Sequence, residues 1–148
     1  MSNVHTEHCI NVCNSLLRGE ISAIETYTQA IDKFRGEPEV TVLEDFRRDH
    51  IASANRLREN VRDMGGEPSN DSGAWGAWAA TIEGAAKLLG DSAALKALQE
   101  GEDHGRKEYE DALEDDEVLS GCKDMIRVEL LPRQLSHIAR LRGLSKAQ

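Results

Sequence analysis

Four long stretches of the chain carry apolar residues at three- and four-residue spacing, and this spacing constrains the fold more than any other feature. It places the apolar side chains on one face of an α-helix, so each stretch predicts a helix with one buried face. A polar or charged residue interrupts each row near its middle. The rows are Cys13, Leu16, Glu20, Ile24, Tyr27, Ile31 and Phe34; Leu43, Phe46, His50, Ala54, Leu57, Val61 and Met64; Leu95, Leu98, Glu102, Gly105, Tyr109 and Ala112; and Ile126, Leu130, Gln134, His137, Leu141 and Leu144.

Capping residues and glycines set the expected helix boundaries. Thr41 and Glu44 have the spacing of a capping box, and Asp91 and Ser120 are residue types that cap helix starts. A turn-rich segment at about residues 67–73 is followed by a short apolar pattern that begins at Trp75. We therefore expect helices over about residues 6–35, 41–64, 75–89, 92–114 and 121–143.

These boundaries pair the long helices into two hairpins joined by a long connection. Antiparallel neighbours are joined by short loops, whereas a long connection lets the chain cross from one end of a bundle to the other. The sequence predicts one all-α domain over residues 1–148. Its expected fold is a ferritin-like antiparallel four-helix bundle whose long crossover contains an additional short helix.

The net charge of −9 argues against partners that are themselves anionic. An acidic surface repels phosphate backbones and anionic lipid headgroups, so we expect no nucleic acid and no membrane partner. The N-terminus lacks the basic-then-apolar order of a signal peptide, and the three cysteines do not indicate a disulfide framework. A cytoplasmic protein is the expectation.

The residues that interrupt the rows are the candidates for function. Glu20, His50, Glu102 and His137 lie at similar depths along their helices, so the fold brings them together near the middle of the bundle. A buried carboxylate or imidazole must be paired, hydrogen-bonded or metal-bound. No catalytic or cofactor-binding residue is assigned beyond these four candidate metal ligands.

Two tyrosines repeat the same pattern in both halves of the chain. Tyr27 follows Glu20 by seven residues, and Tyr109 follows Glu102 at the same spacing, which is about two helical turns. Each pair shares a helix face, so the phenol is expected to reach the buried site. An inward histidine follows on the next helix in each half.

Paired Glu-x6-Tyr motifs that are each followed by a histidine resemble those of rubrerythrins and the wider ferritin-like superfamily. More closely, the segments LLRGEISAIETYTQAI, SGAWGAWAATIEGAAKLLGD, ALKALQEGEDHGRKEYEDAL and LLPRQLSHIARL are similar to an uncharacterised bacterial family of ferritin-like domains of unknown function. The likeness covers roughly residues 12–142. It implies a four-helix bundle, and for the superfamily two iron ions inside it, but no settled activity.

The chain departs from that pattern at two positions. Diiron bundles take a Glu-x-x-His motif from each of two helices, and the residues three before His50 and His137 are Arg47 and Gln134. Two metal ions need anionic bridges, and Arg47 supplies a cation instead. The site is therefore interpreted as degenerate.

Three interpretations remain for the degenerate site. In the first, the protein is a non-catalytic structural or partner-binding bundle in which Arg47 lies between Glu20 and Glu102, so that losing Arg47 costs about 3 to 5 kcal/mol. In the second, the two glutamates and two histidines bind one Fe, Zn or Mn ion. In the third, Asp49 or His104 substitutes for the missing bridges of a diiron oxidoreductase.

Other features give weaker signals. His5, Cys9 and Cys13 share one helix face, and Cys122 should lie at the same end of the bundle, where soft-metal binding competes with ordinary buried thiols. The Trp75 helix is expected to pack onto the bundle, and it is one possible contact of a homodimer. Pro132 should bend the fourth helix near the site.

Overall fold

The computed structural model describes residues 4–73 and 90–147, and over these ranges the protein is helical with no strand. The helices are α1 (Val4–Lys33), α2 (Val40–Asp63), α4 (Asp91–Glu114), α5 (Ser120–Met125), the π-helical turn η2 (Ile126–Leu130) and α6 (Leu131–Ala147). The last three follow one another without a break, so the described parts contain four long helical segments. This confirms the all-α prediction. The helix expected over 75–89, with Trp75, lies outside the described residues.

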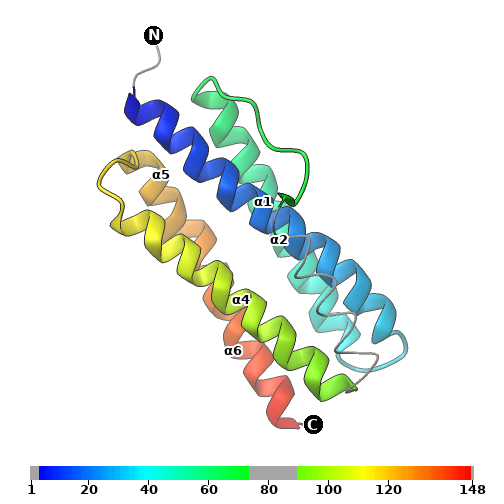
Figure 1. Cartoon of the computed structure of the whole chain (residues 1–148). Coiled ribbons are helices and arrows are strands. Elements are labelled where there is room, and N and C mark those ends of the chain that lie inside the picture. The colour runs from blue at the N-terminus through cyan, green and yellow to red at the C-terminus, as the bar shows by residue number, and fades with distance from the viewer. Residues whose placement is uncertain (1–3, 74–89, 148) are drawn as a thin grey trace.

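The four segments form two hairpins that lie side by side (Figure 1). In one hairpin α1 packs on α2, and in the other α4 packs on α6. Two ion pairs show that α1 and α4 run in opposite directions. Lys33 at the end of α1 lies 3.1 Å from Asp91 at the start of α4, and His8 near the start of α1 lies 2.6 Å from Asp115 just after α4.

The two described ends of the connection between the hairpins lie at different levels of the bundle. After α2, the side chain of Asn14 in the first half of α1 donates a hydrogen bond to the carbonyl of Glu67 (3.0 Å). The other end of the connection is Gly90, which precedes Asp91 and therefore lies beside the end of α1. The described ends thus agree with the long crossover expected from the sequence (Figure 1).

Two apolar clusters fill the space between the helices, one toward each end of the bundle. The first is built around Leu17, Leu57 and Ile126, and the second around Phe34, Phe46 and Leu95. On α1 the buried face is shifted from the predicted row, because Ala23 and Ala30 are buried while Ile24 and Ile31 are only half-buried. Small residues at these positions let the neighbouring helices approach α1 closely.

The helix starts differ from the capping prediction. Glu39, the residue before α2, already has helical backbone angles (φ −63°, ψ −22°), so α2 begins at Val40 and makes no side-chain cap. A capping residue normally has an extended backbone, so the expected Thr41 box has no place to form. Asp91 and Ser120 are likewise the first residues of their helices rather than their caps.

The fourth helical segment contains the π-helical turn η2 immediately before Pro132. A proline ring clashes with the carbonyl four residues earlier, here Val128, and removes a backbone donor. The wider π turn places an extra residue in this stretch, and π turns are one recognised cause of a bend. The distortion expected near Pro132 is therefore a π turn, and the helix continues past the predicted end at Gly143 to Ala147.

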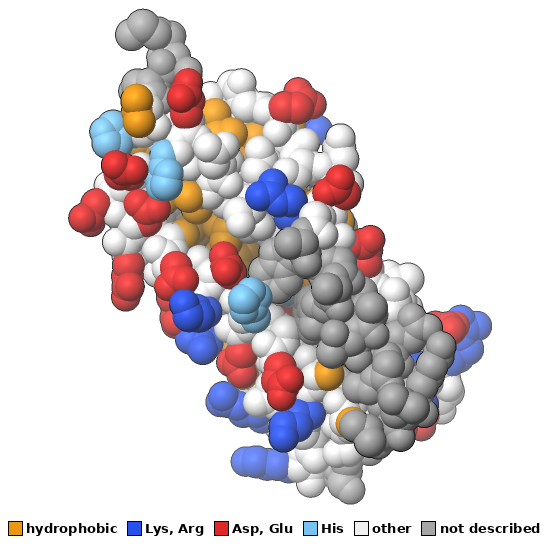
Figure 2. Space-filling view, viewed as in Figure 1, with side chains coloured by type: hydrophobic (Ala, Val, Ile, Leu, Met, Phe, Trp, Pro, Cys, Tyr) orange, Lys and Arg blue, Asp and Glu red, His pale blue; other side chains and the backbone are white. Residues whose placement is uncertain are grey.

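The surface carries many acidic side chains on the face shown in Figure 2. None of the described helices is long and apolar enough to cross a membrane. Val128 and Leu135 are large apolar side chains that stay exposed, by 75% and 46%. The homodimer expected from the sequence stays a prediction.

Candidate metal centre

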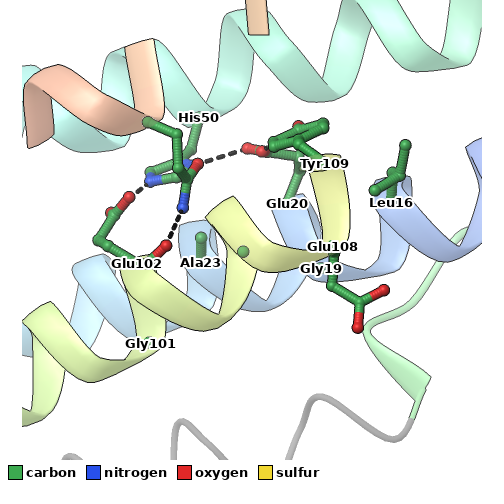
Figure 3. Close-up of a pocket in the computed structure, with 11 residues that line it drawn as sticks. Leu16, Gly19, Glu20, Ala23, His50, Gly101, Glu102, Glu108 and Tyr109 are labelled. Atoms are coloured by element: carbon green, nitrogen blue, oxygen red, sulfur yellow. Dashed lines mark hydrogen bonds and ion pairs between the residues drawn. The ribbon is translucent and has the colours of Figure 1, made fainter. Parts of the chain in front are cut away.

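The four candidate residues meet between the two apolar clusters, one from each long helical segment. Glu20 comes from α1, His50 from α2, Glu102 from α4 and His137 from α6, and each is at most 4% exposed. The helical repeat explains their burial, because each residue occupies the core-facing position of its helix between apolar neighbours. Figure 3 shows His50, Glu20 and Glu102 turned toward one another.

His50 bridges the two glutamates. Its Nδ1 lies 2.6 Å from Glu20 Oε2, and its Nε2 lies 2.7 Å from Glu102 Oε2. Burial alone would lower the pKa of His50, but the charges of Glu102 and Glu20 and the hydrogen bonds to them together raise that pKa well above its ordinary value. His50 therefore carries a positive charge between the two buried glutamates.

The two tyrosines cap the carboxylates reciprocally. Tyr27 on α1 donates to Glu102 Oε2, and Tyr109 on α4 donates to Glu20 Oε1, each over 2.6 Å. Burial, reinforced by the neighbouring glutamate charges, raises the pKa of both phenols well above the ordinary value. Both tyrosines thus stay protonated and act as donors, and the Tyr27 ring also stacks on His50 with ring centres 5.4 Å apart.

His137 completes the cluster on the other side of Glu102. Its Nδ1 lies 3.2 Å from Glu102 Oε1, and its Nε2 lies 2.9 Å from Asp49 Oδ2. Burial alone would raise the pKa of Glu102, but the charge of His50 and the hydrogen bonds from His137 and His50 lower it below the ordinary range. Glu102 is therefore an ionised carboxylate with no exposed surface.

Arg47 does not take the place that the sequence suggested. It is half-buried and donates a long hydrogen bond of 3.5 Å to Thr28 Oγ1, while the glutamate oxygens bind histidine and tyrosine. His50 already lies between the two carboxylates, so the cation expected from Arg47 is supplied by His50. This part of the structural interpretation was wrong.

Gln134 is buried, and its side chain does not bond to a carboxylate of the cluster either. Its Nε2 donates to the backbone carbonyl of Glu102 over 2.9 Å. In an ordinary helix, that carbonyl is already bonded within α4, so the amide adds a second bond to it. Gln134 therefore ties α6 to α4 beside the site and contributes no charge to it.

A small cavity lies against the cluster. Its volume is about 20 Å³, and its lining includes Glu20, His50, Glu102 and three glycines, Gly19, Gly101 and Gly105. That volume holds one water molecule or one metal ion, but not two metal ions with their bridging ligands. Glu108 also lines this pocket, and Figure 3 shows its carboxylate directed away from His50.

Gly105 has no free space beside it for a side chain, although glycine normally weakens a helix. A Cβ atom there would lie 2.5 Å from Gln134 Nε2 and would push this amide off the Glu102 carbonyl. We expect Gly105→Ala to destabilise the protein by about 1 to 3 kcal/mol, since the lost bond leaves a buried amide unpaired. Gly143→Ala is the matched control, because nothing lies within 4 Å of its Cβ, and it should stabilise by up to about 1 kcal/mol. Urea unfolding of both variants measures the difference, and equal stabilisation would contradict the close contact.

Of the two residues that the sequence offered as replacement ligands, Asp49 reaches the cluster and His104 does not. Asp49 does reach the cluster, where it contacts His137 from a position with 45% of its side chain exposed. His104 lies on the surface, 3.7 Å from Glu108, with 57% of its side chain exposed. The spacing could not assign Asp49, because its position next to His50 puts it about 100° away from the core-facing direction.

The chain matches the model of one protein family, described as Domain of unknown function (DUF2383), over residues 8–115. No curated protein and no solved structure matches it. The match includes Glu20, His50 and Glu102, and it ends before His137.

Proposed function

The chain belongs to the family of domains of unknown function DUF2383, and we propose that it is a ferritin-like four-helix bundle that binds one divalent transition-metal ion in its core. His50, Glu102 and His137 are the proposed ligands, with Glu20 as a fourth. The ion is of the kind held by mixed carboxylate and imidazole ligands, such as iron, manganese or zinc. No catalytic step is part of the proposal.

The observation that carries the proposal is the convergence of three ligand groups from three helices. One ligand atom each of His50, Glu102 and His137 lies within 4.8 Å of the others, and all three residues are buried. Glu20 joins them through its 2.6 Å contact with His50. Ligands fixed by packing on rigid helices need little reordering when an ion binds.

The charge of the two glutamates and the residues that contact the proposed ligands favour the same conclusion. Two buried carboxylates attract a divalent cation, and a bound ion would replace the proton that His50 carries between them. Tyr27, Tyr109 and Asp49 each hold one ligand by a hydrogen bond or close contact, and such outer contacts orient metal ligands. The donor set therefore has both the chemistry and the support of a metal site.

The support for one ion rather than two comes from the positions before the histidines. Arg47 bonds to Thr28 and Gln134 bonds to a backbone carbonyl, so neither supplies a bridging carboxylate. A rearranged dinuclear oxidoreductase has less support, since His104 lies on the surface and Asp49 alone offers one carboxylate where two bridges are missing.

A structural bundle without metal is the second candidate, and one observation favours it. Both carboxylates and both histidines already have partners within the cluster. Within the described ranges, only Glu37 Oε2 and Ser145 Oγ are buried side-chain atoms that lack a hydrogen bond. The network can therefore hold the helices together by itself.

Manganese binding tests the proposal directly. Protein purified without a histidine tag and stripped with a chelator should take up about one Mn²⁺ per chain, because Mn²⁺ prefers carboxylate ligands to thiolates. His137→Ala should lose this uptake, while His104→Ala should keep it as the matched control. Elemental analysis after gel filtration gives the stoichiometry, and circular dichroism checks that both variants are folded.

Each other outcome of this experiment has a clear meaning. No uptake of Mn²⁺, Fe²⁺ or Zn²⁺ at this site by the parent would favour the structural bundle. About two Fe ions per chain would instead favour the dinuclear alternative. Equal Mn²⁺ uptake by parent and His137→Ala would contradict the proposed ligand set.

A further inference from the structure

Three cysteines form a second buried cluster toward the end of the bundle where α1 begins. Cys9 and Cys13 lie one turn apart on α1, and Cys122 comes from α5. All three are free thiols with at most 3% of their surface exposed, and their sulfur atoms lie within 4.8 Å of one another. Cys13 is seven residues before Glu20, about 10 Å along the helix, so the two sites are separate.

We propose that Cys9, Cys13 and Cys122 form a binding site for a thiophilic cation, Zn²⁺ or Cu⁺. Both ions bind thiolate ligands well. The site does not depend on the proposed function of the bundle core, because it uses different residues and sulfur ligands in place of carboxylates and imidazoles.

The spacing of the sulfur atoms fits this chemistry. A metal–sulfur bond of about 2.3 Å places two thiolates on one ion about 3.8 to 4.0 Å apart. Cys13 Sγ and Cys122 Sγ are 3.9 Å apart, at that separation already. Cys9 Sγ lies 2.7 Å from Cys122 Sγ. A rotation of the Cys9 side chain that moves this sulfur atom by about 1 Å would let all three thiolates bind one ion.

The surroundings provide one further polar group. Asn60 Nδ2 on α2 donates to Cys122 Sγ over 3.2 Å and to Cys13 Sγ over 3.4 Å. One amide therefore contacts two of the three sulfur atoms, and outer contacts of this kind orient metal ligands.

A disulfide between Cys9 and Cys122 is the competing use of the same atoms. It would form one S–S bond, release two protons and pass two electrons to an oxidant such as hydrogen peroxide. That reaction uses two sulfurs and leaves Cys13 and the hydrogen bonds of Asn60 without a role. The three-way convergence therefore favours metal binding.

Cobalt and copper titrations test the site. Reduced protein under anaerobic conditions, with its core site saturated by Mn²⁺, should show thiolate-to-cobalt charge-transfer absorption when Co²⁺ is added as a probe for Zn²⁺. It should also retain about one Cu⁺ per chain against a chromophoric chelator. Cys122→Ala should weaken binding of both probes by more than the roughly 10- to 100-fold caused by changes in outer contacts. Cys13→Ser, which changes a single atom, serves as the second variant, with circular dichroism as the check of folding.

His137→Ala is the matched control, because it removes a proposed core ligand and leaves every cysteine. It should keep the charge-transfer band while losing Mn²⁺, so failure of one site can be told from failure of the other. Absence of the band together with loss of Cu⁺ to the chelator would overturn the proposal. So would unchanged binding by folded Cys122→Ala, or a Cys9–Cys122 disulfide that resists mild reductant and excludes both ions.

Discussion

Replacing His50 by leucine should lower the free energy of unfolding of the metal-free protein by about 3 to 5 kcal/mol. His50 is the cation between Glu20 and Glu102, with contacts of 2.6 and 2.7 Å. Leucine removes that charge but fills most of the space, so the loss reports the missing cation beside two buried glutamates rather than an empty cavity. Urea unfolding at neutral pH in the presence of a chelator measures the effect.

Arg47→Ala is the control for this experiment, because the sequence alone assigned the balancing charge to Arg47. Its contact with Thr28 is long and near the surface, so the variant should change stability by less than about 1 kcal/mol. A large loss for Arg47→Ala together with a small loss for His50→Leu would restore the sequence interpretation and contradict the network described above.

Replacing Arg47 and Gln134 together by glutamate should create a site for two metal ions. The change creates two Glu-x-x-His motifs, which with Glu20 and Glu102 make the ligand set of diiron bundles. With ferrous iron and air, the double variant should hold about two irons per chain and absorb in the near ultraviolet as an oxo-bridged diferric centre. Without metal it should be less stable than the parent, because clustered carboxylates repel one another.

A shifted pair of substitutions provides the matched control. Arg48→Glu with Leu135→Glu adds the same two carboxylates one residue further along α2 and α6, at positions exposed to solvent. One residue turns a side chain by about 100°, so this variant should keep the metal content of the parent. Equal iron uptake by the two double variants, or by the parent and the Arg47/Gln134 variant, would show that these positions are not where bridging ligands belong.

The sequence predicted the members of the core cluster well, because helical periodicity alone fixes which residues face inward. Glu20, His50, Glu102 and His137 occupy core positions at similar depths, and the structure brings them together. The metal that they are proposed to bind stays a prediction. Periodicity could not predict which residue balances the carboxylates. Arg47 and His50 are one turn apart on α2, and only the helix rotation decides which of them reaches the glutamates.

The sequence was less informative about the cysteine cluster and the helix starts. It placed Cys122 at the same end of the bundle as Cys9 and Cys13, which the structure confirms, but it also grouped His5 with them, and His5 is exposed. The distances between the three sulfur atoms depend on how the hairpins dock, which local spacing does not fix. The missing Thr41 cap has a local cause, since the preceding turn is already helical at Glu39.

The reciprocal tyrosine bonds bear on how the chain folds. Tyr27 of the first hairpin serves Glu102 of the second, and Tyr109 of the second serves Glu20 of the first. Neither hairpin can satisfy its own buried glutamate in this way before the other has docked. A lone hairpin would expose its apolar face and leave its glutamate without the tyrosine hydrogen bond, so it gains little by forming early. The buried cluster of glutamates, histidines and tyrosines thereby couples the two hairpins into one cooperative folding unit.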